Sequence, residues 1–172
     1  MAQHERRSLR RMGGAAVAVG LALCVVPATA EASPTRTVCV PFHATGAGQD
    51  RGGGQTDGTL SIGRHQIGTT TASFDLDLGT GSVATFTGPL VFVPDRVPGS
   101  SIVAQLDGTF DTTTGSFAAQ SSALTGSGAL RRVSGTLRVD GVEGSDGSFT
   151  ETLSGRLCVP AGDRHVLARA VH

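Results

Sequence analysis

The chain has 172 residues, 25 of them glycine, and it contains no tryptophan, tyrosine, asparagine or lysine. This length favours a single domain. Ten of the 14 arginines and 12 of the 14 acidic residues follow residue 32, so that part of the chain carries a formal net charge of −2. The charge argues against a nucleic-acid partner, because phosphate contacts require a concentrated basic surface.

The N-terminal segment has the three parts of a secretory signal. Residues 1–12 contain four arginines, residues 13–26 are almost wholly apolar, and small residues then allow cleavage after Ala30 or Ala32. An apolar stretch of this length is too short to span a bilayer comfortably. Residues 1–32 are therefore predicted to be a cleavable signal peptide. We expect a secreted, extracellular protein that has no stable membrane insertion after cleavage.

Two cysteines, Cys39 and Cys158, follow the predicted signal peptide. An even number of cysteines in an oxidising compartment predicts a disulfide. Because the Cα atoms of a disulfide lie within about 7 Å of each other, the first and last strands are expected to be neighbours. A redox-active or metal-binding pair is the alternative, but neither a Cys-x-x-Cys motif nor a nearby histidine pattern supports it.

Residues 33–160 are expected to form the folded domain, and residues 161–172 a flexible C-terminal tail. Gly, Pro and Asp separate the strand-like runs of this domain. The glycine-rich residues 46–58 are expected to be a flexible loop, and residues 126–133 a single helical turn. The predicted strands cover residues 36–45, 59–63, 67–78, 83–93, 101–111, 115–124, 134–141 and 147–158.

Apolar and polar residues alternate along most of these runs, which indicates half-buried antiparallel strands. Residues 82–93 differ because both faces of this run are apolar, so one face is expected to meet another element or a partner. Two hairpin-like repeats, each returning through Gly-Ser-Phe, indicate an up-and-down meander. The predicted fold class is all-β: an antiparallel up-and-down β-barrel of about eight strands, whose closure removes the sheet edges.

The segment Thr125–Leu137 has the sequence TGSGALRRVSGTL and is followed by Gly147-Ser148-Phe149 and a closing strand. This arrangement resembles the second half of the allene-oxide-cyclase-like and dirigent-like β-barrels, over residues 58–158. The resemblance rests mainly on turn glycines and implies an eight-stranded barrel. The family includes stereoselective cyclases, barrels that steer radical coupling and exported bacterial members. The resemblance assigns no catalytic residue to a position in this chain.

Glu151 is the candidate catalytic residue. In the last predicted strand it falls on the same face as Phe149 and Leu153, among apolar side chains, where burial should raise the pKa of its carboxyl. A carboxyl with a raised pKa can act as a general acid or base. The alternative is a structural role, in which Glu151 pairs with an arginine, lies at the barrel mouth or is turned outward by a bulge.

The remaining polar residues indicate neither a metal nor a cofactor. His43 and His65 are expected at exposed loop or strand-end positions, and no two histidines have the spacing of a zinc site. Asp140, Glu143 and Asp146 do not match a calcium-binding loop and are expected in a solvated hairpin turn.

Three functions are compatible with this sequence. The first is a secreted binding or scaffold module, for a small apolar ligand or as a homo-oligomer. The second is an isomerase or cyclase that shapes a reactive substrate inside the barrel, with Glu151 as its polar group. The third is a secreted inhibitor or surface-interaction protein that uses residues 46–58. Because fold alone does not imply function, enzyme activity stays open.

Overall fold

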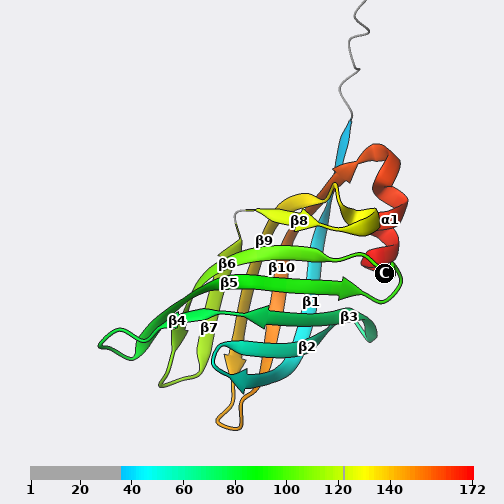
Figure 1. Cartoon of the computed structure of the whole chain (residues 1–172). Helices are drawn as coiled ribbons and strands as arrows, with labels where there is room; N and C mark the ends of the chain where they lie inside the picture. Colours follow the sequence, from blue (N-terminus) through cyan, green and yellow to red (C-terminus); the bar gives the residue numbers. More distant parts are fainter. Residues whose placement is uncertain (1–35, 122) are drawn as a thin grey trace, which may run out of the picture. The chain divides into compact units, whose positions relative to one another are not determined.

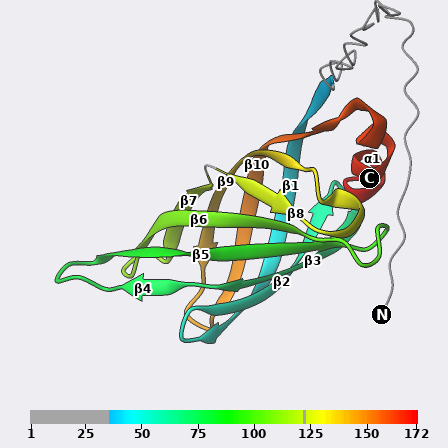
Figure 2. The same cartoon turned by 45° about the horizontal axis from the view of Figure 1, so that its top comes forward.

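The computed structural model of the chain describes residues 36–121 and 123–172 (Figures 1 and 2). The predicted signal peptide and its cleavage positions lie outside these residues. In this part of the chain, no helix is long and apolar enough to cross a membrane. The described residues are mostly antiparallel β-sheet with one short α-helix, so the predicted all-β class is confirmed.

Each predicted strand is present, although two of them are interrupted. The predicted run at 67–78 forms β3 and β4, and the run at 115–124 forms β7 and the start of β8. The strands are β1 (Thr37–Gly52), β2 (Gln55–Ile62), β3 (His65–Ser73), β4 (Asp75–Asp77), β5 (Val83–Pro94), β6 (Ile102–Asp111), β7 (Ser116–Ser121), β8 (Leu124–Gly126), β9 (Ser134–Glu143) and β10 (Ser148–Pro160).

The prediction of a flexible loop at residues 46–58 is wrong. This segment contains the end of β1, a tight turn and the start of β2, and the two strands pair with each other. Glycine is needed at the turn because Gly53 and Gly54 have φ angles of 62° and 76°, in the left-handed region. Other glycines of the segment permit close packing inside the sheet, as described below, and so they do not signal flexibility.

The strand pairings run around a closed ring. The order along the sheet is β4-β5-β3-β2-β1-β10-β9-β7-β6-β8, and a further pairing joins β5 to β6. Eight strands therefore form a circuit, here named the strand ring: β1, β2, β3, β5, β6, β7, β9 and β10. β4 continues β3 along β5, and β8 continues β7 along β6. Every pairing between the described strands is antiparallel, and ring closure leaves no long unpaired edge among them.

The predicted pairing of the first and last strands is confirmed. Cys39 of β1 lies directly opposite Cys158 of β10, and their Sγ atoms are 2.08 Å apart in a disulfide. Leu157 and Val159, on either side of Cys158, are buried in the core, so the disulfide lies on the outer face of the ring. It therefore fastens β1 to β10 and leaves the interior to apolar side chains.

The C-terminal segment differs from the expected flexible tail. It forms a 3-10 turn, η2 (Ala161–Asp163), and then α1 (Arg164–Ala170), and Leu167 and Ala170 are each 1% exposed. Arg132 pairs with Asp163 at 2.7 Å and anchors the segment from outside. The sequence prediction failed because this helix is too short to show a clear apolar period. Its few apolar residues are nevertheless buried, because they pack against the end of the ring.

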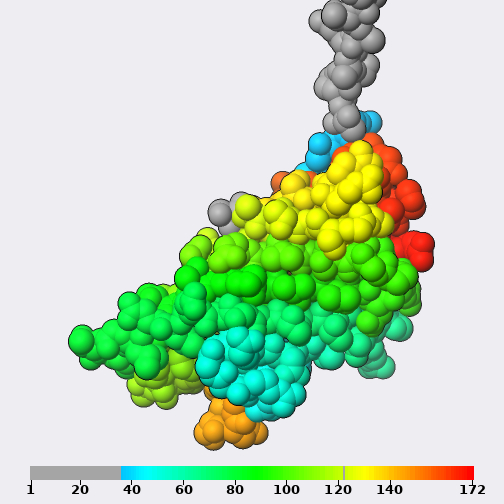
Figure 3. All heavy atoms as spheres, in the orientation of Figure 1, coloured from blue at the N-terminus to red at the C-terminus, as the bar shows by residue number. Residues whose placement is uncertain are grey.

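One end of the strand ring is closed. The buried core continues from the ring interior to Leu167 and to Leu130 of η1 (Gly128–Leu130), the helical turn predicted near this position. Figures 1 and 2 place α1 beside the start of β1 and the end of β10. The hairpins β1–β2, β4–β5 and β9–β10 project at the other end (Figure 3). The two ends therefore have different structures.

The strand ring explains the apolar residues on the inner face of β5 but not those on its outer face. Ala84, Leu90 and Phe92 are buried inside it, whereas Val83 and Val93 are exposed on the outer face. A partner on that outer face, including a second copy of the chain, stays a prediction.

Candidate functional site

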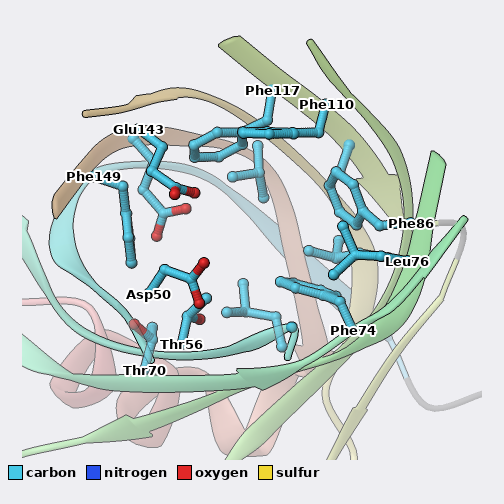
Figure 4. Close-up of a pocket in the computed structure, with 16 residues that line it drawn as sticks. Asp50, Thr56, Thr70, Phe74, Leu76, Phe86, Phe110, Phe117, Glu143 and Phe149 are labelled. Carbon is cyan, nitrogen blue, oxygen red and sulfur yellow. The ribbon is translucent and has the colours of Figure 1, made fainter. Parts of the chain in front are cut away.

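The strand ring contains a cavity at the end opposite α1 (Figure 4). Its volume is about 140 Å³. An engineered protein cavity of roughly 150 Å³ binds benzene, so this space suits one small ring. Five of the seven phenylalanines line the cavity. The lining residues are Asp50, Gly54, Thr56, Thr70, Phe74, Leu76, Phe86, Leu90, Leu106, Phe110, Phe117, Ala119, Val139, Glu143, Phe149 and Glu151.

Strand alternation directs three carboxylates into this cavity. On β10, Phe149, Glu151 and Leu153 face inward, as the sequence predicted. Asp50 of β1 and Glu143 of β9 line the same cavity from the two strands that flank β10. The carboxylates therefore come from three adjacent strands.

Glycines on neighbouring strands make room for the large interior side chains. Phe149 is paired with Gly48, and a Cβ atom at Gly48 would come within 2.4 Å of the Phe149 ring. Glu151 lies in the same way over Gly46, where a Cβ atom would come within 2.6 Å of its Cγ. These glycines let long side chains lie flat across the wall. The same arrangement recurs for Phe117 over Gly141 and for Phe86 over Gly108.

The Glu151 side chain is half-buried, and its carboxyl faces the cavity without a hydrogen-bond partner among the described residues. Burial raises its pKa to about 7. Across residues 36–121 and 123–172, no side chain donates a hydrogen bond to Glu151 and no arginine or histidine lines the cavity. Of the structural roles considered from the sequence, pairing with an arginine is therefore excluded for the described residues. The predicted inward orientation and raised pKa are both present.

Glu143 is a second cavity carboxylate, which the sequence analysis missed. It lies opposite Phe149, and burial raises its pKa, with a further contribution from the charge of Asp50. The alternation of Leu137, Val139 and Gly141 on the inner face of β9 points to this orientation and could have revealed it. The glycine-rich turn that follows Glu143 concealed the signal.

The prediction of solvent-exposed positions around this hairpin turn is correct for Asp140 and Asp146 and wrong for Glu143. Asp140 accepts hydrogen bonds from Arg138 at 2.6 and 2.7 Å on the outer face, which lowers the pKa of Asp140. Asp146 accepts a hydrogen bond of 2.6 Å from the Ser148 hydroxyl within the turn. The three residues are therefore separated, because strand alternation turns only Glu143 inward.

The described residues include no set of three His, Cys, Asp or Glu side chains placed to hold a metal ion. His43 and His65 are both exposed, as predicted, and neither lines the cavity. His65 lies at the start of β3, as expected for a strand end, whereas His43 lies within β1. The chemistry available in the site is therefore that of carboxylates beside aromatic rings.

The cavity wall is divided into a polar and an aromatic part. Figure 4 shows Asp50 and Glu143 on one side, and Phe74 and Phe86 on the other. Phe74 and Phe86 contact each other, with ring centroids 4.9 Å apart. Phe149 lies on the polar side and meets Phe117 edge-to-face at 6.4 Å. Such a wall can hold an apolar body and present negative charge to one part of it.

No family model matches the chain, and no curated protein is significantly similar to it.

Proposed function

We propose that this protein is a secreted β-barrel that binds a small, largely apolar ligand inside the strand ring. The closed circuit of pairings supports a barrel. Secretion is supported by the Cys39–Cys158 disulfide, since disulfides persist in oxidising compartments, and by the signal-like composition of residues 1–32. The resemblance to allene-oxide-cyclase-like and dirigent-like barrels belongs to the same proposal.

The unfilled cavity is the observation that carries this proposal. Protein cores are normally packed to crystal-like density, and an unfilled apolar space lowers stability. Here the closed end of the ring is packed with apolar side chains, whereas the open end retains about 140 Å³ between phenylalanine rings. An apolar concavity with a few convergent polar groups is the usual form of a small-molecule site.

Toluene is a suitable first probe, because its ring matches the size of the cavity. We expect the full chain to bind toluene, as measured by saturation-transfer NMR. The variant Thr56→Phe, which inserts a ring into the wall, should lose most of this binding. The matched control Thr59→Phe places the same ring at an exposed position of the same strand and should bind toluene normally. Absence of toluene binding by the wild type, or equal binding by both variants, would contradict the proposal.

A second candidate function, an isomerase or cyclase, is favoured by the state of Glu151. A carboxyl whose pKa is about 7 can both accept and donate a proton near neutral pH. On this alternative, Glu151→Gln should fold normally and lose turnover of a candidate substrate, and unchanged turnover would exclude Glu151 as the acid or base.

The third candidate function was a secreted inhibitor or surface-interaction protein that uses residues 46–58, and the flexible loop that suggested it is not present. Those residues form paired strands and a tight turn.

A further inference from the structure

We infer that the ligand is a small organic cation, with a compact aromatic or apolar body and an ammonium group. This inference rests on the proposed binding function and specifies the chemistry of its ligand. It follows from the charges of the cavity wall, from their arrangement and from the aromatic surface beside them.

The charge of the described wall has one sign. Asp50, Glu143 and Glu151 line the cavity, and none of the other lining residues is ionisable. The nearest arginine in sequence to Asp50 is Arg51, which pairs with Asp57 at the outer surface. A low-dielectric cleft lined by one sign of charge concentrates ligands of the opposite sign. An anionic ligand would instead meet repulsion at every charged position of the wall.

The strand register places the carboxylates at successive depths. Glu151 is deepest, Glu143 lies opposite Phe149 one inward position nearer the turns, and Asp50 is farther out along β1. Inward positions on a strand are roughly 7 Å apart. The carboxylates are thus spread along one wall, and they do not form a chelating set for a metal ion. Such spacing suits an organic cation whose ammonium group lies against this wall while its apolar body contacts the phenylalanines.

The phenylalanines provide the second half of the recognition. A cation close to an aromatic face is attracted by the ring quadrupole, and this attraction is stronger in a desolvated site. The Phe149 ring lies between the level of Glu151 and that of Asp50 along the wall. The Glu151 carboxyl lacks a hydrogen-bond donor among the described residues, and a bound ammonium group would neutralise it.

The test compares benzyltrimethylammonium with neopentylbenzene, its neutral isostere, and with phenylacetate. Benzyltrimethylammonium has a permanent charge, so any dependence of its affinity on pH arises from the protein. We expect the full chain at pH 8 to bind the cation about tenfold more tightly than the isostere, and to bind phenylacetate most weakly. Affinity for the cation should fall between pH 8 and pH 5, as Glu151 takes up a proton, while affinity for the isostere stays constant.

Glu151→Gln separates the role of the charge from that of the cavity. This variant should lose about tenfold in affinity for the cation at pH 8 and retain affinity for the isostere, which also shows that the cavity is intact. The control Asp140→Asn removes a carboxylate from the outer face of β9 and should leave both affinities unchanged.

The outcomes distinguish this inference from the proposed function. If the isostere binds as tightly as the cation, cation selectivity is refuted and the binding function stands. If phenylacetate binds most tightly, the charge argument is refuted. If none of the compounds and no toluene binds, the binding function itself fails.

Discussion

The same alternation of inward and outward residues fills one end of the strand ring and leaves a cavity at the other. At the closed end, Leu157, Val159 and Leu167 fill the interior, and α1 covers it. At the open end, small residues such as Gly46 and Gly48 occupy inward positions, and long side chains lie flat across them. The closed end of the core therefore contributes mainly to stability, and the open end provides the space for a ligand.

Loss of the disulfide should produce the largest effect. Cys39 and Cys158 are 119 residues apart in sequence, and a cross-link over a loop of this length restricts the unfolded chain by about 5 kcal/mol. The double substitution Cys39→Ala with Cys158→Ala should lower the free energy of unfolding in urea by about that amount. Since the bond lies on the outer face of the ring, toluene binding by the folded fraction should persist; its loss would show that the two ends are coupled.

The next largest effect is the loss of stability when a buried side chain is shortened, which should differ between the two ends of the ring. Leu167→Ala at the closed end should cost about 3 kcal/mol, because a fully buried leucine leaves a cavity. Phe110→Leu at the open end should cost less than about 1.5 kcal/mol, because it is a modest hydrophobic exchange beside existing space. Urea denaturation of both variants measures the difference. Equal losses would mean that the open end is packed as tightly as the closed one.

The smallest expected effect concerns Glu151 and the pH. Burial raises its pKa in the folded protein to about 7, from 4.5, so between these pH values the folded state retains a proton that the unfolded state has lost. The free energy of unfolding should therefore decrease as the pH rises through this window, with no further contribution from this group above it. The full shift corresponds to roughly 3 kcal/mol at pH 8, and solvent screening of the half-buried carboxyl lowers the expected effect. Glu151→Gln should therefore be more stable than the wild type by about 2 kcal/mol at pH 8 and similar to it at pH 4.5.

Denaturation curves at several pH values measure this effect, with Asp140→Asn as the control. Asp140 lies outside the cavity and its pKa is lowered by Arg138, so this variant should not reproduce the change. A wild type whose stability is flat between pH 4.5 and pH 7 would show that the Glu151 carboxyl is not desolvated.

Much of the fold could be predicted from local sequence. Alternation located the strands and the inward face of Glu151, and the cysteine pair identified β1 and β10 as neighbours. The prediction of a flexible loop at residues 46–58 failed because glycine can have either of two structural roles. A glycine can mark a flexible turn, or it can lie under a side chain from the next strand, as Gly46 lies under Glu151. Local sequence does not separate these cases, because the contacting residue is distant in the chain.

The chain's own periodicity was sufficient for most of its strands, because these depend on neighbouring residues, and the number of cysteines was sufficient for the Cys39–Cys158 cross-link. The grouping of Asp50, Glu143 and Glu151 around one cavity was not accessible in that way. It depends on the register of β1, β9 and β10, and a shift of one residue would turn each carboxylate to the outer face. Long-range pairing therefore decides which of the acidic residues face the cavity and which face solvent.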